Sequence, residues 1–581
     1  MNTIDLIEMN IDDEQLLDHS NAVQVFKMVS DTGMVTTNLN SNKMMKNIST
    51  VPEIEAMKRK SLYKIIILTV FGIIFTVATL FSHFYLPSAL ENAIVEEFML
   101  NPESSSYQGW QKSNIPIYSS YYFFNITNPD ELFKAGAKPR LQEIGPYVFQ
   151  LNFEKVNISW NFDNGTVEYR QVKTWTPVPS KSIGSLDDEI VHVNVPLLSG
   201  IHQIRSIPEE EKFLAYESLN SLIDAFNMSF VMKHKIRQLL FEGYEDDLLT
   251  TASSFYPGEV AQTRFGWLYQ KNNTSSDGLF RVYTGQLDSG RKLGLIDTWN
   301  NENENIKWKV GEKCRSFDHT TTGDLQPPFF LRENYHLLQY FGQQNLLKPL
   351  PSIRMFIADI CRSFDLEYME TIETMDQIRR YRYRMGPSTF NYTSSNDNHC
   401  YCKNNKSCPP DGLFDLGICA KDSPVFTSSP HFLFADPSLL NSVDGLQPNI
   451  DKHLFTMEFD HKFALALTID VKFQLNVLAK KSDEIEIMED WPDNFELYLP
   501  QFWFTTHAEL DKSITYQLYF LSNVLPLILL LTTILIALLA IICFIFLTIY
   551  IMNIRMMSWT LNDKTRYESV SMMETKSNDN E

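Results

Sequence analysis

Two long apolar runs without Asp, Glu, Lys or Arg lie near the two ends of the chain, at 65–87 and 513–554. A helix rises about 1.5 Å per residue, so roughly 20 residues cross the hydrocarbon core of a bilayer. A helix also satisfies its own backbone polar groups inside the membrane. The pattern therefore predicts two transmembrane helices, at 63–86 and 518–552.

Basic residues flank both runs on the sides that lead to the chain termini: Lys58, Arg59, Lys60, Lys64 and Arg555. Positively charged residues favour the cytosolic side of a membrane. We therefore expect cytosolic tails at 1–62 and 553–581 and a lumenal ectodomain at 87–515. The first run starts too far into the chain for a cleaved signal peptide, so it is interpreted as a signal anchor.

Between the runs, segments rich in Tyr, Phe and Val are bounded by turn signals, as strands are. They lie at 117–126, 147–153, 166–175, 279–284, 454–457 and 464–478. From 209 to 250, apolar residues instead recur at helical spacing, which predicts an insert of two or three helices. The fold class is therefore expected to be α+β, with a large antiparallel sheet in the ectodomain and two transmembrane helices.

Eight glycosylation sequons fall in the predicted ectodomain, at Asn125, Asn157, Asn164, Asn227, Asn272, Asn273, Asn391 and Asn405. Each is a surface acceptor if this segment enters the secretory pathway. Asn272 and Asn273 overlap and are expected to carry one glycan. Asn47 lies in the predicted cytosolic tail and is expected to stay unmodified.

Six of the seven cysteines lie within 314–419, and Cys543 lies in the second apolar run. The six are Cys314, Cys361, Cys400, Cys402, Cys408 and Cys419. An even number in a secretory segment predicts a disulfide framework, although six cysteines allow 15 pairings. The alternative is a metal site, but Cys400-Tyr-Cys402 lacks the spacing of paired C-x-x-C knuckles.

The net charge of −21 argues against nucleic acid as a partner. Nucleophile, zinc-protease, P-loop and dinucleotide motifs are absent from the sequence. His319, His336, His431 and His461 are not at ligand spacing, and we interpret them as structural or surface residues. We expect no enzymatic activity, no metal and no cofactor.

Both predicted cytosolic tails carry a short sorting pattern. Asp12 stands four residues before Leu16 and Leu17, which fits an acidic dileucine signal, and Tyr567 with Val570 fits a tyrosine signal. Clathrin adaptors bind such patterns as extended peptides. The two motifs predict an endosome or lysosome membrane protein, with transit through the plasma membrane compatible with both.

Several stretches together resemble the class B scavenger receptor family. They are 122–131, 136–149, 239–248, 361–363, 400–419, 429–437 and 444–449. The resemblance implies a large, distorted antiparallel β-barrel with a helical bundle at the membrane-distal apex, which 209–250 matches. It also implies the disulfides Cys314–Cys400, Cys361–Cys419 and Cys402–Cys408.

The resemblance further implies lipid handling, with sterols, fatty acids or phospholipids passing through a tunnel in the ectodomain. Plasma-membrane relatives carry a lysine cluster at the apex, whereas the matching segment here is mostly apolar. Its candidate binding residues are Phe226, Phe230, Lys233, His234 and Lys235. An exposed apolar helix face suits a protein partner, such as a lysosomal hydrolase, or a second copy of the chain. The alternative is that Phe226 and Phe230 are core residues.

Two other classes of protein remain as alternatives. A two-span ion channel would need small or polar pore residues, whereas both runs are bulky and apolar, with few polar residues such as Thr532 and Thr533. An ectoenzyme with terminal anchors would need a catalytic motif. His234 is a candidate pH switch if the apex binds a hydrolase.

Overall fold

The computed structural model describes residues 51–578, except 114, 256–261, 310, 329–347, 374–377, 395 and 403–406. The chain forms two compact units. One runs from Thr79 to Ile534. The other contains the helical segments up to Ala78 and from Leu535 onwards.

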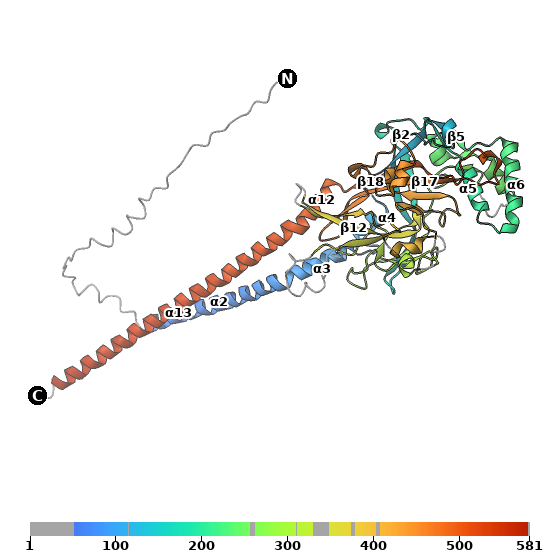
Figure 1. Cartoon of the computed structure of the whole chain (residues 1–581). Helices are drawn as coiled ribbons and strands as arrows, with labels where there is room; N and C mark the ends of the chain where they lie inside the picture. The colour runs from blue at the N-terminus through green and yellow to red at the C-terminus, as the bar shows by residue number, and fades with distance from the viewer. Residues whose placement is uncertain are drawn as a thin grey trace, which may run out of the picture. The chain divides into compact units, whose positions relative to one another are not determined.

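A sheet of 14 described strands forms the body of the unit 79–534 (Figure 1). The strands are β1 (Ile117–Ile126), β2 (Leu141–Asn161), β3 (Thr166–Pro177), β8 (Leu279–Tyr283), β9 (Ile296–Trp299), β10 (Thr320–Thr321), β11 (Ser352–Ile357), β12 (Arg362–Glu373), β13 (Arg379–Met385), β14 (Leu413–Asp415), β15 (Val425–Ser428), β16 (Thr456–Asp460), β17 (Ala466–Lys480) and β18 (Glu496–Glu509). Their order is β10-β11-β12-β13-β16-β17-β18-β1-β2-β3-β8-β9, with β14 and β15 attached to β17.

The sheet curves into a barrel. All its strand pairs are antiparallel except β10 with β11. A backbone bridge between Leu295, just before β9, and Thr321 of β10 joins the two ends of the strand order. Phe364 of β12 and Phe473 of β17 are separated by two strands in the sheet, yet their ring centroids lie 6.4 Å apart. This contact crosses the inside of the barrel, and the expected α+β fold is confirmed.

Alternation along β1 explains how the barrel is lined. β1 lies between β18 and β2, and the side chains of Tyr121 and Phe123 are buried inward against Phe502 of β18. Successive strand residues point to opposite faces. The intervening Tyr122 therefore stacks on Trp503 on the other face, with ring centroids 4.0 Å apart.

The apical region lies at the end of the body away from α3 and α12 (Figure 1). It contains α5 (Val195–Ile204), α6 (Glu209–Phe226), α7 (Asp247–Phe255), the π-helix η3 (Gln238–Glu242), and the strand pairs β4 (Glu189–Val193) with β5 (Val231–Lys235) and β6 (Tyr244–Glu245) with β7 (Arg264–Phe265).

The predicted insert of two or three helices at 209–250 contains α6, η3 and the start of α7, but the strand β5 interrupts it. α6 is one long helix, but it ends at Asn227, which adopts a left-handed conformation with φ 48°. The chain then pairs as β5 with β4, from Glu189–Lys235 to Val193–Val231. Over so short a stretch, the apolar spacing of 230–240 fits both the helical period of 3.6 residues and the strand period of 2. Pairing with β4 therefore decides that 231–235 forms a strand. α5 was not predicted.

The remaining helices include the membrane-spanning candidates. They are α2 (Val51–Phe84), α3 (Leu86–Phe98), α4 (Ser105–Gln111), α8 (Glu312–Arg315), α10 (Pro437–Asn441), α11 (Ile450–His453), α12 (Lys512–Tyr519), the π-helix η9 (Phe520–Val524), α13 (Leu525–Asn578), and the short 3-10 helices η1 (Pro129–Glu131), η2 (Pro179–Lys181), η5 (Ala358–Ile360), η6 (Asn396–Tyr401), η7 (Pro430–Phe432) and η8 (Glu486–Met488).

Two helical stretches are long and apolar enough to cross a membrane, Arg59–Phe84 and Lys512–Thr560. They overlap the two predicted spans, 63–86 and 518–552. The helices approach closely at Gly72, where an added Cβ atom would lie 3.2 Å from the ring of Phe544. A small residue at this position therefore lets α13 pack tightly on α2.

Candidate functional site

A continuous apolar region runs through the inside of the barrel to the apex. The Trp267 side chain packs against three groups of buried apolar residues, which belong to the apical helices, to the β1–β18 side and to the β11–β13 side. Its ring centroid lies 5.3 Å from that of Phe502 and 5.5 Å from that of Phe265. Trp267 therefore links the apical core to the barrel core through apolar contacts.

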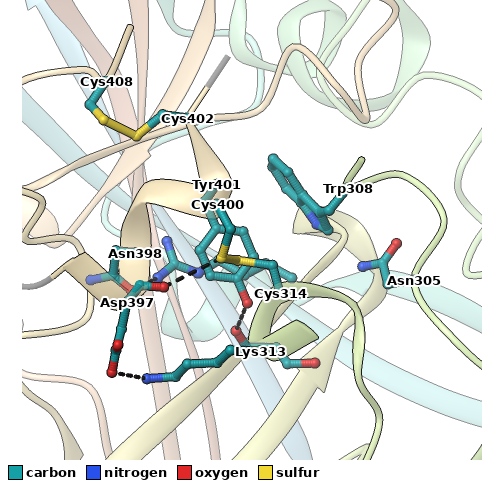
Figure 2. Close-up of a disulfide and its surroundings, with 12 residues drawn as sticks. Asn305, Trp308, Lys313, Cys314, Asp397, Asn398, Cys400, Tyr401, Cys402 and Cys408 are labelled. Carbon is teal, nitrogen blue, oxygen red and sulfur yellow. Dashed lines mark hydrogen bonds and ion pairs between the residues drawn. A yellow bond between two sulfur atoms is a disulfide. The ribbon is translucent and has the colours of Figure 1, made fainter. Parts of the chain in front are cut away.

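The three disulfides Cys314–Cys400, Cys361–Cys419 and Cys402–Cys408 are present in the structure, and they are the pairs that the resemblance implies. Figure 2 shows Cys314–Cys400 joining α8 to η6. Beside it, Lys313 Nζ lies 3.1 Å from Asp397 Oδ2. Trp308 Nε1–H donates to the carbonyl oxygen of Cys361 at 2.8 Å. This region is a structural clamp rather than a metal site.

The outer face of α6 is acidic and partly apolar. Phe213 and Leu214 are 75% and 70% exposed. The same helix carries exposed carboxyl groups at Glu209, Glu210, Glu211, Glu217 and Asp224. The one basic residue of α6, Lys212, has its Nζ 2.7 Å from Glu209 Oε2. A face with this charge would repel polyanionic ligands.

Phe226 and Phe230 have different environments. Phe226 ends α6 and is 44% exposed, whereas Phe230 is 6% exposed. The Phe230 ring lies 4.8 Å from Trp491 and 5.7 Å from Phe133, between centroids. The two interpretations of these residues were partner binding and core packing. Phe230 is a core residue and is not available for docking.

The lysines of β5 form ion pairs with neighbouring carboxylates, and its histidine stacks on an aromatic ring. Lys233 Nζ lies 2.7 Å from Glu189 Oε2, and Lys235 Nζ lies 3.2 Å from Asp187 Oδ1. The ring of His234 stacks on Tyr244 at 3.8 Å between centroids. β5 thus presents paired charges instead of a cluster of unmatched lysines.

His234 also shares a hydrogen bond with His192. His192 Nδ1–H donates to the carbonyl of Val193 at 2.8 Å, so its Nε2 accepts from His234 Nδ1–H at 2.9 Å. Burial, followed by the charge of His234, lowers the pKa of His192 to about 3, and burial lowers the pKa of His234. Both rings are therefore neutral in the folded protein at neutral pH.

A second histidine network was not anticipated from the sequence. His431 is buried, and its Nε2 lies 2.6 Å from Glu143 Oε2, which also accepts from Trp503 Nε1–H at 2.7 Å. These residues come from η7, β2 and β18. Pro430 stands directly before His431, in the stretch 429–437 that carries the resemblance, and is a local signal of a constrained position.

The predicted glycan acceptors differ in how their amides are used. Asn157, Asn164, Asn227, Asn272 and Asn273 are exposed. Asn125 Oδ1 accepts from the backbone N–H of Val191, and Asn391 Nδ2–H donates to Asp411 Oδ2. Asn405 lies outside the described residues.

The predicted sorting residues are mostly outside the part of the chain that the structure describes. This holds for Asp12, Leu16 and Leu17. Tyr567 and Val570 fall within α13, although adaptors bind such motifs as extended peptides. Recognition of this motif would require that the end of α13 unwinds.

The fold defines a class of membrane protein, in which a disulfide-clamped α+β barrel lies between two candidate membrane-spanning helices. The CD36 family model matches residues 69–551, and the chain belongs to this family. The resemblance to class B scavenger receptors is thereby confirmed.

Three curated relatives illustrate the range of similar proteins. Protein peste of Drosophila melanogaster is 28% identical over 72% of this chain and 70% of its own length. Scavenger receptor class B member 1 of Rattus norvegicus is 30% identical over 68% of this chain and 71% of its own length. Lysosome membrane protein 2 of Homo sapiens is 25% identical over 75% of this chain and 84% of its own length.

Proposed function

We propose that the chain is a scavenger-type lipid receptor and transporter of the endosome and lysosome membrane, without enzymatic activity. It would move sterols, fatty acids or phospholipids through its ectodomain. The observation that carries this proposal is the continuous apolar interior around Trp267, inside a barrel whose chain ends lead into two candidate spans. A shell of this kind can hold an apolar ligand away from water.

Mass spectrometry of lipid bound to the secreted ectodomain 87–515, purified at acidic pH, tests this function. We expect a stoichiometric sterol, fatty acid or phospholipid. A Trp267→Asp variant should lose it, because a carboxylate would interrupt the apolar interior. An exposed residue, changed as Leu287→Asp, is the matched control. A lipid-free ectodomain would contradict the proposal.

A second candidate function is delivery of a lysosomal hydrolase. The exposed Phe213 and Leu214, within an acidic face of α6, favour a protein partner with a basic and apolar surface. A second copy of this chain is less suited to the face, since two acidic surfaces repel each other.

Both tails are proposed to be cytosolic and to bind clathrin adaptors. Replacing Leu16, Leu17 and Tyr567 with Ala should move the protein to the plasma membrane, as seen by surface biotinylation. Vesicular localisation that does not change in this variant would contradict sorting by these motifs.

A further inference from the structure

A pocket of about 410 Å³ lies where the two membrane-spanning segments meet the barrel, within the unit 79–534. One wall comes from the helices, with Ser82 near the end of α2 and Pro526, Leu529 and Leu530 at the start of α13. The other wall comes from β13 and the β16–β17 turn. Its volume is within the roughly 300–1,000 Å³ that is usual for small-molecule sites.

The pocket lies near one end of the first candidate span, Arg59–Phe84, and within the second, Lys512–Thr560. Ser82 is two residues from the end of the candidate span Arg59–Phe84, and its Oγ lies 2.6 Å from Thr533 Oγ1. Segments at this depth border both the acyl chains and the headgroups of one leaflet. A molecule in the pocket would therefore contact lipid on one side and the ectodomain on the other.

The ectodomain wall is mainly cationic. Arg379 and Lys462 line it, and each has a carboxylate neighbour. Arg379 Nη2 lies 2.9 Å from Oε1 of Glu373, which is outside the lining, and Lys462 Nζ lies 3.8 Å from Oε1 of the lining residue Glu91. His461 fixes this wall, because both its backbone N–H and its ring Nδ1 bond the carbonyl of Arg379, at 3.2 and 3.1 Å. Guanidinium and ammonium groups are the usual ligands of phosphate oxygens.

A further observation points to a ligand. The π-helix η9 (Phe520–Val524) interrupts regular helical hydrogen bonding between α12 and α13, and π-turns are frequent at functional sites. η9 places Ser522 on the pocket. The Ser522 hydroxyl is buried and has no hydrogen-bond partner within the described part of the chain. A buried hydroxyl without a partner is costly, and a bound polar group would satisfy it.

We propose that this pocket binds the phosphate-bearing headgroup of a membrane phospholipid. Arg379, Lys462 and the Ser522 hydroxyl would hold the phosphate, and Glu91 would face an amine of the headgroup. Leu529 and Leu530 would lie along the acyl chains. Basic pockets beside transmembrane helices bind headgroups in this way. The proposal adds a membrane-facing lipid site to the proposed transport function and rests on that function only for its use in the cell.

The test uses the full chain in nanodiscs of phosphatidylcholine and phosphatidylserine, followed by transfer to detergent and native mass spectrometry of the retained phospholipid. We expect R379Q/K462Q to retain at least about tenfold less phospholipid than the unchanged protein, since two charge-assisted hydrogen bonds are lost. K480Q removes one exposed charge on β17, where Lys480 Nζ lies 2.7 Å from Glu496, and should retain the normal amount.

Ser522→Ala is the second variant, because R379Q/K462Q could fail to fold after Glu91 loses its counter-charge. Ser522→Ala removes a hydroxyl that bonds nothing else described, so it should keep the melting temperature and retain about fivefold less phospholipid. Equal retention by the unchanged protein and folded variants, or equal loss in K480Q, would overturn the proposal.

Competition distinguishes the source of the phosphate. Inorganic phosphate in excess should not displace the retained lipid, because it lacks acyl chains to contact Leu529 and Leu530. Displacement by inorganic phosphate would show a free-anion site and overturn the lipid assignment. If the isolated ectodomain 87–515 carries lipid but R379Q/K462Q retains the normal amount of phospholipid, the headgroup site in this pocket is rejected and the proposed transport function is not. If the isolated ectodomain carries no lipid but R379Q/K462Q and Ser522→Ala retain less phospholipid, only transport through the barrel is rejected.

Discussion

The imidazole rings of His431 and His453 lie parallel, with their centroids 4.2 Å apart. The Nδ1 atom of His431 accepts the backbone N–H of Gln447, and that of His453 accepts the backbone N–H of Asn449. Because Nδ1 is the acceptor in each ring, His431 donates its Nε2–H to Glu143. A proton added to Nδ1 of His453 would break its hydrogen bond with the backbone N–H of Asn449.

This stacked pair predicts a loss of stability in acid. Burial, followed by the charge of His431, lowers the pKa of His453 to about 4, against an ordinary value of 6.5. The unfolded chain then binds more protons than the folded chain between these values. The contribution to the free energy of unfolding is complete above about pH 6.5 and is lost as pH falls towards 4.

We expect the melting temperature of the full chain to fall over this range, and to fall less steeply in a His453→Asn variant. Asn keeps an acceptor near the position of Nδ1 but does not titrate. His507→Asn, at a half-exposed histidine, is the matched control and should keep the original slope. A slope that His453→Asn leaves unchanged would show that another group causes the acid sensitivity.

Local patterns explain which parts of this fold could be predicted. β1 matches the predicted strand 117–126 because a run rich in Tyr and Phe, bounded by turn signals, favours a strand. β5 was missed because it has five residues, and its partner β4 lies in a separate part of the chain. The pairing of His431 with Glu143 spans 288 positions, so no spacing rule could indicate it. The membrane-proximal pocket likewise combines residues from both ends of the ectodomain.

The apex gives a prediction that separates docking from folding. Phe213→Asp and Leu214→Asp change exposed residues of α6 and should leave the melting temperature nearly unchanged, while a hydrolase complex is lost in pull-down experiments. Phe230→Ala should instead lower the free energy of unfolding by about 3–5 kcal/mol, since it leaves a cavity beside Trp491 and Phe133.

The apex prediction fails if the hydrolase complex is not lost. A complex that survives Phe213→Asp and Leu214→Asp would place the hydrolase elsewhere or remove it as a partner. Ser218→Asp, at an exposed position between them and the end of α6, controls for added charge on this acidic face.

The overlapping sequons should be used at Asn273 rather than Asn272. Asn272 Oδ1 accepts the backbone N–H of Trp175 at 2.8 Å, and its Nδ2–H donates to the carbonyl of Trp175 at 3.3 Å. Both residues are exposed, but a glycan on Asn272 Nδ2 would have to displace the second of these bonds. Glycopeptide mass spectrometry should therefore find the sugar on Asn273.

Matched variants extend the glycan prediction. Asn273→Gln should remove the glycan with little effect on stability, while Asn272→Gln should keep the glycan on Asn273 and lower the melting temperature through the lost bonds to Trp175. A sugar found on Asn272 would contradict the geometry of this pair.

The disulfides should contribute to stability in the order of the loops that they close. Cys402–Cys408 spans 6 positions, Cys361–Cys419 spans 58 and Cys314–Cys400 spans 86. The chain-entropy relation gives about 2 kcal/mol for the smallest loop and about 4–5 kcal/mol for the two larger ones. Paired Cys→Ala replacement at 402 and 408 should therefore lower the free energy of unfolding least, as measured by chemical denaturation. An equal loss from all three replacements would show that native packing around Trp308 and Tyr401, rather than loop closure, sets the contribution of this region.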